Sequence, residues 1–215
     1  MQQKQVKTQI KESSSFRDLD LTRTCARDLI KNVSEPWEAL ISLHSFIYAR
    51  GNALPFDEFD EIADNLWVHV SAYLSPTAHL RSPCIICAGA QISHGACVSG
   101  SIIGSAARIG ENSIVKNSLL FDRVRLVGNN FVDTSLIGYA ASLSASVSLS
   151  ATRGDGAPVI CATQKGSLPT DRARLGSIVC DGATVGENAV LTAGSYVCPH
   201  AAVPPLTCVT GYYGI

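Results

Sequence analysis

The side chains best suited to proton transfer in this sequence are its five histidines. An imidazole with an unperturbed pKa of about 6.5 can take up and release a proton near neutral pH. His94 is the candidate general base, because it occupies an outward position of the repeat described below and could deprotonate an amine or a hydroxyl. A solvated or subunit-contacting histidine is the alternative interpretation. The other histidines are expected to be surface or packing residues: His44, His69, His79 and His200.

Basic and amide side chains in the middle of the chain could bind an anionic substrate. The candidate substrate-binding residues are Lys116, Arg108, Arg125, Asn129 and Asn130. For the three basic residues, the alternative is an ordinary solvated face. Asn130 falls at an inward position where the repeat favours a small residue, and a buried amide must be hydrogen-bonded. Bonding to the backbone of a neighbouring coil is therefore the alternative for Asn130.

The eight cysteines are dispersed along the chain and do not indicate a disulfide framework. Cys84 and Cys87 form a single CxxC motif. A structural zinc site would need a second pair at suitable spacing, and a redox motif would need a thioredoxin-like βαβ pattern around it. We therefore expect reduced thiols that pack as small hydrophobic residues, and no metal site.

A hexapeptide repeat positions these residues. From residue 68 onward, branched aliphatic residues recur every six residues, and three of the steps are shortened to five. The short steps recur every 17 residues, the first lying between Val98 and Ile103. Three hexads, one of them trimmed, then make one turn of a triangular coil. The aliphatic positions, called anchors below, are Val68, Leu74, Leu80, Ile86, Ile92, Val98, Ile103, Ile109, Val115, Leu120, Leu126, Val132, Ile137, Leu143, Leu149, Val179, Val185, Leu191, Val197, Val203 and Val209.

Small residues mostly follow four positions after each anchor, as expected where a corner leaves little room. A period of six places successive anchors on different faces of an α-helix, which excludes a helical interpretation. A β-sandwich would not keep fixed spacing over so many steps. The pattern therefore predicts an all-β fold, a left-handed parallel β-helix of about seven coils, each stabilised by its neighbours.

The periodicity also divides the chain. Residues 1–66 are predicted to form an N-terminal helical segment and lead-in, with two helices within residues 20–50. Residues 67–215 are predicted to form the β-helix, interrupted by a projecting arm at about residues 150–178. Trp37 and Trp67 are expected to be packing residues rather than a platform for a ligand.

Charge and hydropathy exclude several partners. The formal net charge is −1, and the few basic residues are scattered, so the chain lacks the basic footprint of a nucleic-acid-binding protein. No apolar run reaches the ~18 to 20 residues of a membrane span. The first residues lack the apolar core of a signal peptide. We expect no nucleic-acid or membrane partner, and a cytoplasmic location.

The segments IIGSAARIG and VGENAVLTAG resemble the hexapeptide-repeat acyltransferase superfamily. The order EPWEAL, SPTAHL, IVKNSLLFD and SLIG, followed by an arm, is similar to bacterial proteins related to UDP-N-acetylglucosamine pyrophosphorylase. Those proteins resemble the acetyl-transferring half of the bifunctional enzyme that makes UDP-N-acetylglucosamine. The resemblance implies a homotrimer with sites between subunits, acetyl-CoA or another acyl-CoA as co-substrate, a sugar or sugar nucleotide as acceptor, and no required metal. It does not imply pyrophosphorylase activity, because a Gly-rich nucleotide-binding domain is missing.

The site of the resembled acetyltransferase is only partly matched. Its general-base histidine aligns with Gly128, and a tyrosine that holds the sugar aligns with Phe131. A sugar-phosphate arginine falls at Ser93, and a substrate asparagine falls at Ala151. Lys116 matches a basic position of that site.

Three functions remain open from the sequence. The first is an acyl-CoA-dependent transferase with His94 in place of the missing base. The second is a non-catalytic trimeric scaffold or sugar-nucleotide-binding protein. The third is the γ-carbonic-anhydrase branch of the fold, which needs three histidines around zinc. The spacings between His69, His79 and His94 do not resemble that branch.

Overall fold

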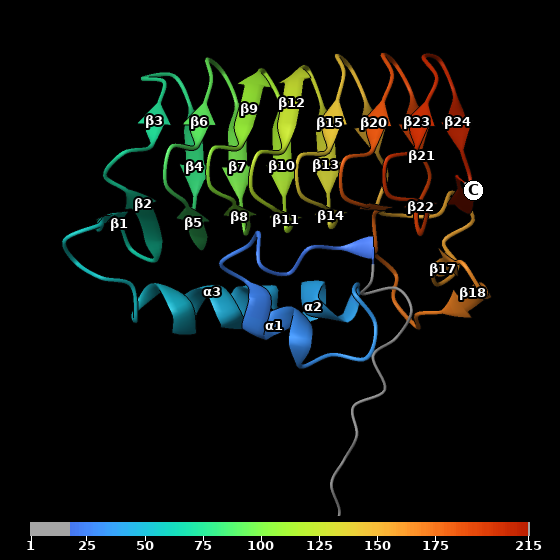
Figure 1. Cartoon of the computed structure of the whole chain (residues 1–215), viewed down its shortest axis with the longest axis horizontal. Coiled ribbons are helices and arrows are strands. Elements are labelled where there is room, and N and C mark those ends of the chain that lie inside the picture. The colour runs from blue at the N-terminus through green and yellow to red at the C-terminus, as the bar shows by residue number, and fades with distance from the viewer. Residues whose placement is uncertain (1–17, 215) are drawn as a thin grey trace, which may run out of the picture.

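The computed structural model describes residues 18–214, which form a three-sided parallel β-helix with a layer of short helices along one side (Figure 1). The helices are α1 (Arg27–Lys31), α2 (Glu38–Ile41) and α3 (Leu43–Gly51). The second helix expected from the sequence is interrupted at Ser42, which ends α2 and precedes α3. None of the described helices is long and apolar enough to cross a membrane.

Three sheets make the sides of the β-helix, called faces A, B and C in chain order. Face A contains β1 (Phe59–Ala63), β2 (Leu66–His69), β5 (Cys84–Ile86), β8 (Ile102–Ile103), β11 (Leu119–Leu120), β14 (Leu136–Ile137), β19 (Ile178–Val179), β22 (Tyr196–Val197) and β25 (Tyr212–Tyr213). Face B contains β3 (Tyr73–Leu74), β6 (Gln91–Ile92), β9 (Arg108–Glu111), β12 (Arg125–Gly128), β15 (Ser142–Leu143), β20 (Thr184–Val185) and β23 (Ala202–Val203). Face C contains β4 (His79–Arg81), β7 (Cys97–Ser99), β10 (Ile114–Lys116), β13 (Phe131–Asp133), β16 (Ser148–Leu149), β21 (Val190–Leu191) and β24 (Cys208–Val209).

The anchors stack in register, which confirms the predicted fold. On face A, Ile86 pairs with Ile103, Ile103 with Leu120, and Leu120 with Ile137. Faces B and C have seven strands each, as seven coils require. Face A has nine strands and so exceeds the predicted number of coils. The two additional strands are β25, which begins an eighth turn, and β1, which pairs antiparallel with β2.

The five-residue steps form a tight corner between faces C and A, and buried serines stabilise it. The Ser101 hydroxyl accepts a hydrogen bond from the Ser118 backbone N–H, and the Ser118 hydroxyl accepts one from the Ser135 N–H, both at 3.0 Å. The Ser135 hydroxyl accepts the same bond from Ser177 across the arm. Each of these hydroxyls also donates to the backbone carbonyl two residues earlier. This serine ladder satisfies buried N–H groups that the shortened corner leaves without a sheet partner.

Face A carries a second apolar layer that the predicted single-walled coil lacks. Its strands from β2 to β22 are buried on both sides, because the residue before each anchor is also large and apolar, as in Ile102-Ile103 and Leu119-Leu120. The outward residues pack with the helices in a core that includes Trp37 and Trp67, each 5 % exposed. Both tryptophans are therefore packing residues, as expected. Among residues 18–214, this helical layer lies on face A and not on faces B or C.

The arm leaves the coils after Leu149 and returns at Ile178, and Ile137 pairs directly with Val179, so the coil stack continues across it. It contains a hairpin of β17 (Ile160–Thr163) and β18 (Gly166–Pro169), seen beside β22 in Figure 1. The hairpin does not project freely. The Ala162 N–H donates to the Gly194 carbonyl at 2.9 Å, and Val159 and Cys161 are buried in the layer on face A.

The serine ladder predicts that two serine-to-alanine changes in the β-helix differ in their effect on stability. Replacing Ser118 with Ala leaves the buried Ser135 N–H without its acceptor, which is expected to lower the free energy of unfolding by about 1 to 3 kcal/mol. The control is Ser148→Ala, because this serine is half-buried on face C. Urea unfolding monitored by circular dichroism measures both. Equal stabilities for the two variants would contradict the structural role of the ladder.

Candidate functional site

The corner between faces B and C holds the candidate base. The Asn112 N–H donates to the His94 carbonyl at 3.0 Å, and the Asn129 N–H donates to the Glu111 carbonyl at 2.8 Å. The Ser146 N–H donates to Gly128 in the same way. His94, Glu111 and Gly128 thus occupy equivalent positions in three successive coils, called the corner column below. The structure therefore places His94 two coils before Gly128 in one column, a distance of about 10 Å.

His94 is exposed, and its ring is held at one nitrogen. Its Nδ1 lies 2.6 Å from the Thr77 hydroxyl oxygen, which also accepts a hydrogen bond from the Gly95 N–H at 3.2 Å. The Ser75 hydroxyl lies 3.2 Å from that same oxygen. The Thr77 hydroxyl can therefore accept the Nδ1 proton while donating its own proton to Ser75. In that arrangement Nε2 carries a free lone pair that faces the solvent.

His69 provides an internal contrast. The Ser71 backbone N–H donates to its Nδ1 at 3.0 Å, and a backbone donor cannot reverse its role. Neutral His69 is therefore fixed with its proton on Nε2. It cannot accept a proton there, whereas His94 can do so when Thr77 acts as an acceptor.

Arg108 and Arg125 are paired directly across adjacent strands of face B, with both side chains exposed. Like charges directly opposite each other destabilise a sheet. Within residues 18–214, neither guanidinium forms an ion pair with an acidic side chain. Two uncompensated guanidiniums on neighbouring coils are suited to binding phosphate.

The remaining predicted site residues lie in three different places. Asn129 is exposed next to Gly128 in the corner column, with a positive φ of 53°. Lys116 lies on face C, with its Nζ 5.6 Å from the centre of the Phe131 ring. Asn130 lies inside the coils at 1 % exposure, where its Oδ1 accepts from the Val147 N–H at 2.9 Å. Asn130 therefore contributes to the interior of the coils, which is the backbone-bonded alternative considered from the sequence.

The positions that the resemblance aligns with the site of the acetyltransferase lie as follows in this structure. Gly128 is buried at the end of β12, paired with Glu111, and offers only backbone there. Phe131 packs beneath Lys116. Ala151 is 4 % exposed at the start of the arm. Ser93 immediately precedes His94, so a proton acceptor stands next to a position where the resembled site has an arginine.

Thr77 is the site residue that the sequence interpretation missed. It lies 17 residues before His94, and one turn of the coil there is 18 residues, so Thr77 stacks next to Gly95, which directly follows His94. Subtracting the 17 or 18 residues of one coil from the number of each candidate residue would have identified Thr77 as a neighbour of His94. The direction of its hydroxyl hydrogen could not be obtained in this way.

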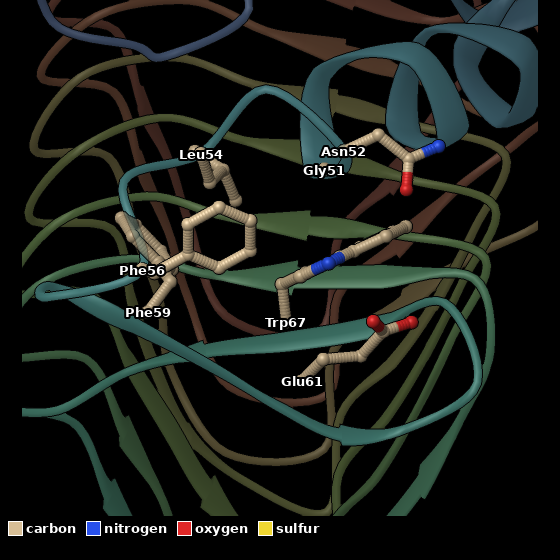
Figure 2. Close-up of a pocket in the computed structure, with 7 residues that line it drawn as sticks. All are labelled: Gly51, Asn52, Leu54, Phe56, Phe59, Glu61 and Trp67. Carbon is tan, nitrogen blue, oxygen red and sulfur yellow. The ribbon is translucent and has the colours of Figure 1, made fainter.

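Two of the hollows that lie outside this region each have a tryptophan among their lining residues. Figure 2 shows one near the first coil, where the Trp67 indole lies between Gly51 and Glu61 and two phenylalanines form one wall. A Cβ at Gly51 would come within 2.3 Å of that indole, so the close packing requires glycine. The second lies between α2 and the arm, with Trp37, Leu40, Arg172 and Arg174 among its lining residues. Neither hollow contains a predicted site residue.

Within residues 18–214, no three histidine, cysteine, aspartate or glutamate side chains lie close enough together to hold a metal ion. His69 lies on β2 of face A, His79 on β4 of face C, and His94 in the corner between faces B and C of the next coil. A metal centre contained within one described chain is therefore not formed by these histidines.

A family model matches most of the coils. The family model of the GMPPB C-terminal domain matches residues 80–208, from β4 to β24. No curated protein sequence matches the chain. Similar solved structures include the acetyltransferase domain of PglB from Neisseria gonorrhoeae, with 18 % identity and a TM-score of 0.39 over 60 % of this chain and 52 % of that one. PerB from Caulobacter crescentus, in complex with CoA and GDP-perosamine, has 18 % identity and a TM-score of 0.29 over 63 % of this chain and 50 % of that one.

The chain thus aligns with about half the length of these two solved structures. Likenesses this distant allow no residue and no activity to be transferred. The family match covers more than half of the sequence and coincides with the observed coils. The predicted superfamily is therefore confirmed, and this chain belongs to the GMPPB C-terminal domain family of hexapeptide-repeat β-helix proteins.

Proposed function

We propose that this protein is an acyl-CoA-dependent acyltransferase that acts on an amino sugar or a sugar nucleotide. The observation that supports it best is the exposed His94 ring, which is bonded through Nδ1 to Thr77 and can present Nε2 as a proton acceptor. We propose that it works as a homotrimer, with each site completed by a neighbouring subunit. The acyl-CoA and the trimer follow from the superfamily resemblance, and the base follows from this geometry.

In the proposed reaction, the substrate amine attacks the thioester carbonyl of the acyl-CoA. His94 accepts the proton that the amine must lose, through Nε2, and the resulting imidazolium is stabilised by the Thr77 oxygen at Nδ1. The carbon–sulfur bond then breaks, and the CoA thiolate leaves and takes up a proton. The products are an amide and free CoA. General base catalysis of this kind typically contributes about 10²- to 10⁴-fold to the rate.

Arg108 and Arg125 would bind a phosphate of the sugar nucleotide or of the acyl-CoA. Each begins a strand of face B, β9 or β12, that leads towards the corner column. A strand rises about 3.3 Å per residue, so the arginines lie about 10 Å from that column. This separation suits a ligand that carries its phosphate at one end and its reacting group at the other.

A non-catalytic sugar-nucleotide-binding protein or scaffold is the second candidate. The observation that favours it is Gly128, which leaves only backbone at the position where the resembled acetyltransferase has its base. The arginine pair would remain a phosphate site in such a protein. The two candidates therefore predict the same binding and differ only in turnover.

The first prediction about the proposed function concerns His94 as the general base. The wild-type protein is expected to bind acetyl-CoA and a UDP- or GDP-sugar and to release CoA in the presence of an amino sugar acceptor. His94→Ala should lower the turnover about 10²- to 10⁴-fold with little change in ligand binding. His69→Ala is the matched control, because the His69 tautomer excludes it from the same role.

A thiol-reactive assay follows CoA release, and isothermal titration measures binding. Absence of binding of either ligand at millimolar concentration would eliminate the transferase proposal. Binding of the sugar nucleotide without acyl transfer would instead support the non-catalytic candidate.

The second prediction concerns Thr77. Thr77→Val removes the acceptor for the Nδ1 proton and should lower kcat about tenfold or more while leaving KM for the acyl-CoA nearly unchanged. Thr77→Ser keeps the hydroxyl and should restore most of the rate. Equal rates for the valine and serine variants would show that Thr77 does not orient His94.

The third prediction concerns the arginine pair. Arg108→Gln and Arg125→Gln should each weaken binding of the phosphate-bearing ligand about 10- to 100-fold, because a hydrogen bond to a charged group contributes about 1.5 to 3 kcal/mol. Neither change should destabilise the fold, since each removes a like-charge contact. Arg81→Gln, on face C of the first coil, is the control. Unchanged affinity in both face B variants would place the anion site elsewhere.

A further inference from the structure

Residues 18–25 lie along the corner between faces A and B, and this segment is called the corner strap below. In Figure 1 it is the blue segment that runs between the helices and the coils. The Tyr196 hydroxyl donates to the Asp18 carboxylate at 2.6 Å, and the Asp122 N–H donates to the Arg23 carbonyl at 2.9 Å. The strap therefore crosses from β22, in the seventh coil, towards the first coils.

The Asp181 carboxylate fixes the end of the strap that lies on the later coils. It accepts hydrogen bonds from the backbone N–H groups of Asp20 and Tyr139. Partial burial raises the pKa of Asp181, and these two hydrogen bonds act in the opposite direction. The Arg23 guanidinium lies 5.1 Å from the centre of the Tyr139 ring. Several independent contacts thus hold this end against the coils.

At its other end, the strap is held by a pair of thiols. The Cys87 sulfur lies 3.5 Å from the Cys25 sulfur and donates its hydrogen bond to it. Cys87 directly follows β5 and is 4 % exposed, whereas Cys25 is half-buried on the strap. Both are free thiols. A disulfide needs the sulfurs to approach to about 2.05 Å, so each must move by less than about 1 Å.

The two thiols differ in pKa and in accessibility, so one of them is the nucleophile. The hydrogen bond from Cys87 lowers the pKa of Cys25, and the Arg50 guanidinium acts in the same direction, while burial and the Asp122 carboxylate oppose them. Donating that hydrogen bond, together with burial, raises the pKa of Cys87. Cys25 is thus the thiol that ionises first and is also the more accessible of the two.

We propose that Cys25 and Cys87 form a reversible disulfide that locks the corner strap and the helical layer onto the β-helix. A low-molecular-weight disulfide such as glutathione disulfide is the oxidant. The Cys25 thiolate attacks one of its sulfurs, its S–S bond breaks, and one glutathione thiolate leaves and takes up a proton. Cys87 then loses its proton to solvent, attacks the Cys25 sulfur and displaces the second glutathione. Two cysteine thiols are oxidised, and one glutathione disulfide is reduced to two thiols.

Among the described cysteines, the thiol–thiol hydrogen bond joins Cys25 to Cys87, and three of the others are placed differently. The Cys84 thiol donates to the Arg81 carbonyl at 3.1 Å, and burial raises its pKa to about 11. Cys161 is buried in the layer on face A, and burial raises its pKa to about 12. Cys208 is exposed on face C. An oxidant is therefore expected to cross-link Cys25 and Cys87 selectively.

The bridge would close a covalent ring from residue 25 to residue 87, which contains all three helices. Such a ring restricts the unfolded chain, and in the folded chain it holds the helical layer against face A. Oxidation should therefore protect the N-terminal region more than the last coils. The effect is independent of acyl transfer, so it can succeed or fail separately from the proposed function.

The experiment treats the full-length protein with excess glutathione disulfide, blocks the remaining thiols with N-ethylmaleimide and maps peptides by mass spectrometry. The expected result is one peptide pair joined through Cys25 and Cys87, lighter by two hydrogens than the sum of the free peptides. Thermal unfolding should show a Tm about 5 to 10 °C higher after oxidation, reversed by dithiothreitol. Hydrogen exchange should slow across residues 18–51.

Cys25→Ser and Cys87→Ser should each abolish the cross-link and the oxidant-dependent shift of Tm. Cys208→Ser removes the exposed thiol and should leave both effects intact. If one serine variant fails to fold, peptide mapping of the wild type still decides the pairing. Recovery of Cys25 and Cys87 as maleimide adducts after oxidation would overturn the proposal, as would a stable mixed disulfide on Cys25. A cross-link without any change in Tm or exchange would overturn the locking role.

Discussion

The structure depends on one constraint: each anchor must stack directly on the equivalent anchor of the preceding coil. This register places Ile86, Ile103, Leu120 and Ile137 in one row and satisfies the backbone hydrogen bonds of adjacent coils simultaneously. Because side chains alternate in direction along a strand, a slip of one residue would turn the aliphatic row outward. The arm shows how strict the constraint is. The chain makes a long excursion after Leu149 and still returns with Val179 paired to Ile137.

The same constraint explains which parts of the structure could be predicted from the sequence. The inward register repeats at fixed spacing, so the coils and the position of the arm follow from residue types alone. The outward layer was missed, although the sequence carries its signal in the second apolar residue of Ile102-Ile103 and Tyr196-Val197. The path of the corner strap has no such periodic signal. Its position depends on contacts such as Tyr196 with Asp18, which join residues far apart in sequence.

For the site, the length of one coil predicts which residues lie close together, but it does not predict which of them can transfer a proton. It places Arg108 opposite Arg125 and brings His94 close to Thr77, and the structure shows both pairs. It does not reveal whether a ring nitrogen accepts or donates a proton. His69 and His94 are both outward histidines with a hydroxyl residue nearby. The bond from a backbone N–H to His69 and the bond from a rotatable hydroxyl at His94 separate their roles.

The residues that stabilise this β-helix differ from those proposed to carry its chemistry, and that separation limits what the fold says about function. The anchors and the serine ladder face inward, whereas His94, Arg108 and Arg125 face outward and contribute little to packing. An outward residue can therefore change without a penalty in the core, so the presence of the coils is not evidence for activity. The arginine pair is more informative. Two like charges on adjacent coils reduce stability, and binding of an anion would compensate for that loss.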